Sequence, residues 1–238
     1  MGKGTATIAR LNLKHIKAAY ITAIILALVA LIQTSIFYII ASSSGSGMDN
    51  ATVAPGAYVF LVVLMAAMII PASNFRKVIN LGGRRDNFFW GTLMAYVIIA
   101  VLGSMINTVM FYTFDLFIQN SGYFGSLGGV MNPVQVFDWT QNGFAIAFLQ
   151  QAAFLFLLAC FVHTLASVQG KWYGWAANVV IAAILAVFIP IAFLRQSLVW
   201  FFEMVIFHEN AFIQIAFCIV LAIVIYMLNK PIYTRKAI

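Results

Sequence analysis

Charged residues are scarce in this sequence. Of its 238 residues only 8% are Asp, Glu, Lys or Arg, whereas 64% are hydrophobic. Soluble globular proteins carry about 25% charged residues, so a chain with so few could not cover a folded core with a wettable surface. The composition therefore excludes a soluble protein and predicts one that is solvated by the lipid bilayer.

Cysteines and catalytic motifs are also scarce. The two cysteines, Cys160 and Cys218, each lie inside an apolar run, where a thiol is expected to be small apolar filler rather than half of a disulfide. The sequence contains no G-x-x-x-x-G-K-[ST] phosphate loop and no H-E-x-x-H zinc motif. We therefore expect neither an enzyme nor a metal or cofactor bound by this chain.

The net charge of +7 does not indicate nucleic-acid binding, because the basic residues are scattered between apolar runs instead of being gathered on one surface. A membrane-spanning helix needs about 20 apolar residues. The sequence predicts an all-α membrane protein of six transmembrane helices, with spans at about 18–41, 53–71, 88–111, 143–168, 175–194 and 211–228.

Basic residues segregate when the spans are threaded through a membrane. With the N-terminus in the cytoplasm, only Arg195 lies outside, and twelve of the thirteen basic residues lie inside: Lys3, Arg10, Lys14, Lys17, Arg76, Lys77, Arg84, Arg85, Lys171, Lys230, Arg235 and Lys236. Only one of the six acidic residues, Asp86, lies inside. The positive-inside rule therefore predicts cytoplasmic N- and C-termini in the cell membrane.

Two segments outside the spans have an amphipathic or apolar character of their own. Residues 1–17 place Arg10, Lys14 and Lys17 on one stripe, which predicts either an amphipathic interfacial helix or a plain basic flank. Residues 195–210 are too apolar for a simple loop and too short to span the bilayer. They predict a re-entrant or interfacial outer hairpin, or else an extension of the neighbouring spans.

Uncharged polar residues inside the spans have two interpretations. Most are expected to form hydrogen bonds between helices, because lipid offers them no partner. Gln33, Thr34 and Asn178 are also candidates for a translocation path. Among ionisable residues away from the span ends, only His163 remains, and it is interpreted as a hydrogen-bonded packing residue.

The inner loop at 73–87 carries the most specific signal. Gly82 and Gly83 break the helix, and the charged residues after them can begin a new one that ends at Phe88, Phe89 and Trp90. This pattern predicts a short helix beneath the membrane, against which a soluble partner would dock. The alternative is a basic topogenic loop without a partner.

The segment from Gly82 to Gly91, GGRRDNFFWG, resembles the G-x-[ST]-R-K-x-x-F-x-G segment of small ABC-2 type exporter permeases from Gram-positive bacteria. Gly82, Arg84, Arg85, Phe89 and Gly91 can be laid on that pattern, with the spacing shifted by one residue. The order of amphipathic helix, six spans, basic inner loop and apolar outer segment is similar along the whole chain.

The resemblance implies a type V exporter-like permease that pairs with a second permease copy or paralogue and with a cytoplasmic ABC ATPase subunit, which binds ATP and Mg. Amphipathic peptides, including antimicrobial peptides, and hydrophobic drugs are the implied cargo. The residues implied for the ATPase-coupling loop are Arg76, Lys77, Arg84, Arg85, Asp86, Asn87, Phe88 and Phe89. A secondary transporter and a non-transport membrane protein remain the alternatives.

Overall fold

The computed structural model describes residues 3–44, 52–117, 130–169 and 172–235. The main helices are α1 (Lys3–His15), α2 (Lys17–Ser44), α3 (Val59–Ile69), α4 (Phe75–Asn80), α5 (Arg85–Met110), α7 (Pro133–Val136), α8 (Gly143–Val168), α9 (Trp172–Phe188), α10 (Ala192–Phe202), α11 (Ala211–Met227) and α12 (Asn229–Arg235). Shorter elements are the 3-10 turns η1 (Pro55–Tyr58) and η4 (Trp139–Asn142), the π turns η2 (Ile70–Asn74), η3 (Phe111–Asp115) and η5 (Glu203–Phe207), and the parallel strands β1 (Thr52–Val53) and β2 (Val130–Met131).

Five helical runs are long and apolar enough to cross a membrane, and a sixth crossing results if the bent pair α9–α10 counts as one span. The five runs are Lys17–Ile40, Pro55–Asn80, Arg85–Asp115, Trp139–Val168 and Ala211–Tyr233. The predicted all-α, multi-pass membrane protein is therefore confirmed. The fourth predicted span coincides with α8 at both ends.

The second span is longer than the sequence predicts. It was expected to end at Pro71, but the helix continues through the π turn η2 into α4. Pro71 lacks an N–H group and cannot continue a regular α-helical ladder. The wider π turn accommodates it without ending the helix, so most of the predicted inner loop at 73–87 is helical.

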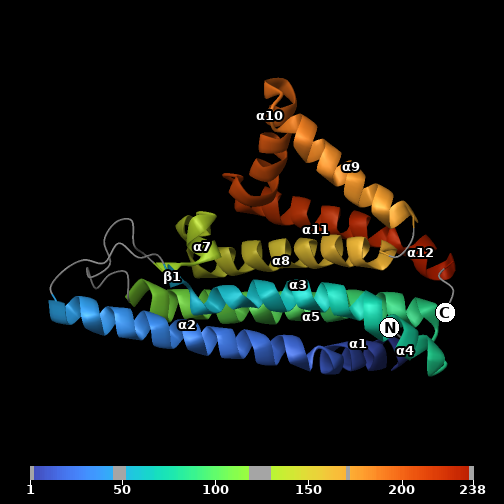
Figure 1. Cartoon of the computed structure of the whole chain (residues 1–238), viewed down its shortest axis with the longest axis horizontal. Helices are drawn as coiled ribbons and strands as arrows, with labels where there is room; N and C mark the ends of the chain where they lie inside the picture. The colour runs from blue at the N-terminus through green and yellow to red at the C-terminus, as the bar shows by residue number, and fades with distance from the viewer. Residues whose placement is uncertain (1–2, 45–51, 118–129, 170–171, 236–238) are drawn as a thin grey trace.

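Helix α8 lies at the centre of the bundle and packs against α3, α5 and α11 (Figure 1). Small residues such as Ala66, Ala100 and Ala159 are buried between these helices. A Cβ atom at Gly103 of α5 would overlap the side chain of Val59. The close approach follows the usual rule for helices in lipid, where small residues allow backbones to meet.

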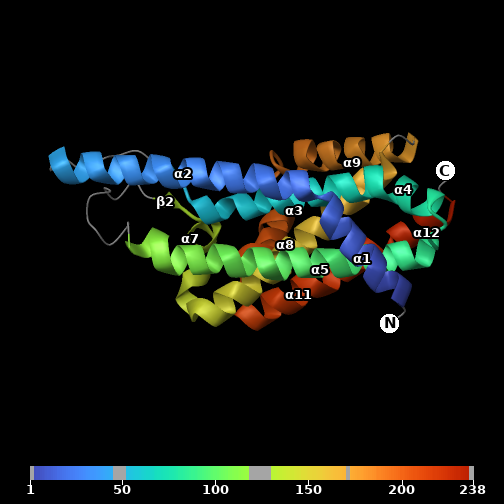
Figure 2. The same cartoon turned by 90° about the horizontal axis from the view of Figure 1, so that it is seen from below.

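Helix α1 crosses α5 obliquely, and Figure 2 shows this crossing from below. Ile8 is buried against Gly91, whose missing side chain leaves room for it and for the carbonyl of Thr5. The basic residues Arg10 and Lys14 are exposed on the other face. Residues 3–15 therefore form a helix whose apolar face packs on the protein, and its predicted place at the membrane interface stays a prediction.

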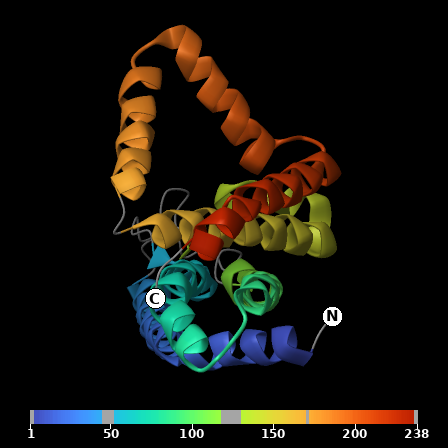
Figure 3. The same ribbon diagram turned by 90° about the vertical axis from the view of Figure 1, so that its right-hand side faces the viewer.

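The predicted fifth span and outer hairpin take a different form in the structure. Helix α9 ends at Phe188, a break at residues 189–191 contains Pro190, and the chain then continues as α10 and η5 to Phe207. The two helices are bent by 116° and stand away from the bundle as an arm (Figures 1 and 3). Instead of a hairpin, residues 195–210 contribute one helical run up to Phe207, because no turn signal interrupts them.

The chain ends, α4 and α12 all lie at one end of the bundle (Figure 1). We call this the basic end, since Arg76, Lys77, Arg84 and Lys230 lie on these segments or next to them. The opposite end contains α7, η3 and η4, and we call it the amide end after the buried Asn and Gln side chains described below. Cys160 and Cys218 are both buried and unbridged, as the sequence predicts.

Candidate functional site

A tight turn between α4 and α5 lies at the basic end. Gly82 has a φ of +80°, a conformation that glycine adopts without steric cost, and the N–H of Gly83 closes the turn on the carbonyl of Val78. Leu81 projects from this turn with 81% of its surface exposed. Arg76, Lys77, Arg84 and Asp86 are exposed around it. An apolar tip surrounded by charges is a surface that a protein partner can bind.

Not all of the predicted loop residues lie on this surface. Phe88 is fully buried in edge contacts with Phe75 and Tyr233, whose ring centroids are 5.2 Å and 5.5 Å away. Phe89 is 3% exposed and packs on Tyr226. Both aromatic rings therefore belong to the interior, where they hold α5 against the C-terminal segment.

The helix after the two glycines also differs from the expectation of a short element. It begins at Arg85, as predicted, but continues as the 26-residue α5 without a break at Phe88–Trp90. Arg85 is half-buried and donates to the carbonyl of Tyr233, 3.1 Å away. Asn87 is half-buried beside Gly4. The exposed part of the predicted loop is thus confined to the turn and its flanks.

Buried aromatic side chains surround His163 in the interior of the basic end, and we call them the ring cluster. His163 is fully buried on α8, with its Nδ1 2.6 Å from the hydroxyl of Tyr96 and its Nε2 2.8 Å from that of Tyr233. The hydroxyl of Tyr233 is also 3.0 Å from that of Ser167. Because both imidazole nitrogens are used, His163 joins α5, α8 and α12, as expected for a packing histidine.

The amide end contains a second buried polar cluster. Asn107 and Asn132 exchange two hydrogen bonds of 3.0–3.1 Å through their side-chain amides. Asn132 also donates to Asp115 Oδ2 over 2.8 Å and accepts the N–H of Val134. Asp115 is fully buried, and its Oδ1 has no hydrogen-bond partner among the described residues. Asn132 is therefore the junction that fixes α7 to the end of α5.

Glutamines extend this polar packing along α8. Gln150 Nε2 donates to Gln214 Oε1 of α11 over 2.6 Å, and Gln214 in turn donates to the carbonyl of Val205. Gln151 accepts hydrogen bonds from Thr108 and Ser104 of α5. The interpretation of these residues as interhelical hydrogen-bonding groups is thus confirmed.

The three candidate path residues do not form a common cluster. Gln33 is exposed on α2, whereas the adjacent Thr34 is fully buried and its hydroxyl has no partner among the described residues. Asn178 of α9 is exposed and exchanges hydrogen bonds of 3.3 Å and 3.4 Å with Gln169. A path through all three stays a prediction.

No protein-family model, curated protein sequence or solved structure matches this chain. The function of the chain is therefore inferred from its own geometry.

Sequence reasoning missed Asp115, Asn132 and Tyr233. Asp115 and Asn132 fall within the predicted outer loop at 112–141, where no periodic pattern indicates burial. Tyr233 lies after the last predicted span, among Lys230, Arg235 and Lys236. Its aromatic ring within this basic segment was the available signal, since a tyrosine there can pack inward while its neighbours remain solvated.

Proposed function

We propose that the chain is the transmembrane permease subunit of an ATP-driven exporter in a bacterial cell membrane, of the ABC-2 type. Two permease subunits, as a second copy or a paralogue, would work with two cytoplasmic ABC ATPase subunits. ATP and Mg are bound and ATP is hydrolysed on those partners, so this chain is a transport subunit and not itself an enzyme. Its cargo is an amphipathic peptide or a hydrophobic compound.

The observation that carries the proposal is the exposed turn at the basic end. An 81% exposed leucine among four exposed charges combines an apolar centre with a charged rim, which suits a cytoplasmic protein that covers Leu81 and pairs the charges. The turn is rigidly connected to the interior through Arg85 and Phe88. A displacement of the turn by a bound partner would therefore move α5 and α12 as well.

Asp115 supports a second candidate function, a secondary transporter driven by protons or cations. Such transporters need ionisable groups at membrane depth, and the sequence alone places this residue in a loop. The structure buries it at the end of a membrane-spanning run, and one of its oxygens has no hydrogen-bond partner within the described part of the chain. If purified protein in liposomes transported cargo in response to an ion gradient without ATP, this second function would replace the first.

The test of the permease proposal is site-specific photocrosslinking in the native host. A photoreactive amino acid at position 81 is expected to crosslink a protein that contains the G-x-x-x-x-G-K-[ST] phosphate loop. The matched control is the same amino acid at Leu102, which is 58% exposed in the middle of α5 and should face lipid.

A functional variant completes this test. Leu81→Asp is expected to reduce co-purification of the ATPase and ATP-driven export together, because a buried apolar contact is replaced by a desolvated charge. The variant should still insert and fold, since Leu81 makes little contact within the chain. Crosslinking only to lipid at position 81, combined with normal export by Leu81→Asp, would contradict the proposal.

A further inference from the structure

Two pockets of opposite character meet at the π turn η5. The first has a volume of about 440 Å³ and is lined only by apolar side chains, which include Leu158 of α8, Phe202 of α10 and Leu221 of α11. The second has a volume of about 320 Å³ and lies towards the amide end, where Asp138, Gln150 and Glu209 contribute to its wall. Ile206 lines both pockets.

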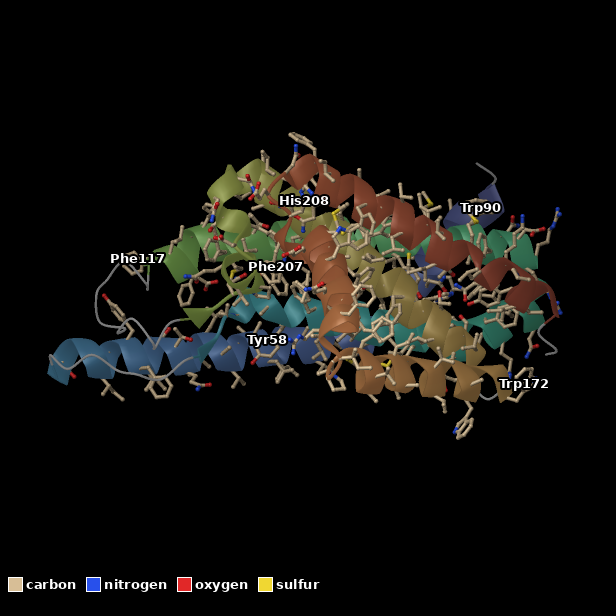
Figure 4. All side chains as sticks on the ribbon, turned by 90° about the horizontal axis from the view of Figure 1, so that it is seen from above. Tyr58, Trp90, Phe117, Trp172, Phe207 and His208 are labelled. Carbon is tan, nitrogen blue, oxygen red and sulfur yellow. The ribbon has the colours of Figure 1, made fainter. Side chains whose placement is uncertain are left out.

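The segment at Ile206, which separates the two pockets, is held in place by two hydrogen bonds. Trp139 Nε1 donates to the carbonyl of Ile206 over 2.9 Å, and Gln214 Nε2 donates to the same carbonyl over 3.2 Å. Figure 4 shows Phe207 and His208, which follow Ile206 where the chain passes from α10 to α11. Because the carbonyl of Ile206 is bonded from two sides, the two pockets keep a fixed spacing.

The second pocket has a negative bias. Asp138 and Glu209 are its two carboxylates, and among the residues that the structure describes neither Lys nor Arg lines it. Asp138 is held by the side-chain amide of Gln141 and adopts a left-handed backbone conformation with a φ of +59°. The ring of His208 accepts the N–H of Asn210 on Nδ1, 3.0 Å away. A cationic group therefore complements this pocket, and an anionic group does not.

We propose that the two pockets together bind one cationic amphiphile, with its apolar chain in the first pocket and its ammonium or guanidinium head in the second. Each pocket lies within the size range of small-molecule sites. Apolar burial would supply affinity for the chain, while the carboxylates would select the sign of the head group. As the binding site of the exported molecule, this inference rests on the proposed function, but the binding itself does not require a partner.

The experiment uses the full chain in phosphatidylcholine nanodiscs without any ATPase, so that its result is independent of the permease proposal. The probe is a long-chain primary amine that carries a photoreactive diazirine at the end of its chain. We expect crosslinks in the first pocket, at Leu158, Phe202 or Leu221. The matched alcohol, which has the same chain without the charge, should label this pocket more weakly.

Two pairs of variants separate binding from folding. The double variant Asp138→Asn/Glu209→Gln is expected to weaken labelling by the amine about five- to tenfold and to leave labelling by the alcohol unchanged. Its control is Glu203→Gln, an exposed carboxylate of η5 outside both pockets. Leu158→Trp should fill the first pocket and abolish labelling there, whereas Val220→Trp on the exposed side of α11 should not.

Competition then identifies the source of the ligand chemistry. Phosphatidylethanolamine added to the nanodisc represents a membrane lipid with an amino head group, and a short Lys/Leu peptide represents a cationic peptide. Displacement of the amine by either supports the site and names its source. Labelling spread evenly over the exposed faces of α2 and α9, with no effect of the charge-removing variant, would overturn the inference.

Discussion

The two ends of the bundle both contain packed aromatic rings but differ in their buried polar contacts. At the basic end, rings pack on rings: Phe75, Phe88 and Tyr233 meet within 5.5 Å, and His163 is bonded to two tyrosine hydroxyls. At the amide end, aromatic rings also pack, as in Phe137 and Trp139 with centroids 5.0 Å apart, but the polar contacts are amide hydrogen bonds such as those between Asn107 and Asn132. The apolar pocket and the polar pocket meet at η5, close to this second end.

This difference separates two mechanical roles. Ring packing fills space and leaves Tyr96 and His163 fully enclosed, so the basic end is suited to transmitting force from the exposed turn without changing shape. Amide pairs can exchange partners at small cost when water or a ligand enters. The amide end is therefore the part of the bundle in which we expect rearrangement to occur.

The sharpest prediction concerns which end faces the cytoplasm. In a background without Cys160 and Cys218, Gln141→Cys at the amide end should react fully with a membrane-impermeant thiol reagent applied to intact cells. Lys230→Cys at the basic end should not react until the cells are opened, because the positive-inside rule places this end in the cytoplasm. Both positions are exposed, so the reverse labelling pattern would invert the orientation.

The next largest effect is expected at the amide junction. Asn132→Leu leaves Asn107, Asp115 Oδ2 and the N–H of Val134 without their partner. Since each buried unpaired polar group costs about 1–3 kcal/mol, we expect a loss of about 3–5 kcal/mol in stability. Thermal unfolding in nanodiscs measures it. Asn80→Leu, at an exposed position of α4, is the control, and an equal Tm for both variants would show that the junction does not stabilise the bundle.

A smaller and more local effect is expected at the ring cluster around His163. His163→Phe preserves the packing but removes a partner from Tyr96 and from Tyr233, which retains Ser167, so the loss should be about 1–3 kcal/mol. Cys160, one helical turn away on α8, should then be alkylated faster, while Cys218 on α11 serves as the internal reference. His15→Phe, on the exposed side of α1, should change neither rate. An unchanged alkylation rate of Cys160 in His163→Phe would show that the ring cluster adds no rigidity.

The sequence alone predicts most of the spans because their signal is local. A long and mostly apolar run locates α8 to the residue, and Gly82 locates the turn before α5. The burial of Phe88 is a tertiary effect. Its aromatic ring is as compatible with a membrane interface as with an interior, and only the position of Tyr233 decides between them.

The predictions that failed have a similar origin. Residues 195–210 have the composition of an interfacial hairpin, but composition does not determine the 116° angle that Pro190 and its neighbours create. Asp115 falls in the predicted loop because the sequence after Phe111 is rich in Gly, Phe and Asn. The π turn η3 carries the helix on to this residue and buries it against Asn132.

The position of Tyr233 has a consequence for biosynthesis. A ribosome delivers α5 and α8 to the membrane long before α12, yet His163 and Phe88 can contact Tyr233 only after α12 has been made. Until then, the nascent bundle has an open seam between α5 and α8 at the basic end. During this interval, quality-control proteases that recognise exposed aromatic rings could bind the nascent chain. Packing of Tyr233 would then cover these rings.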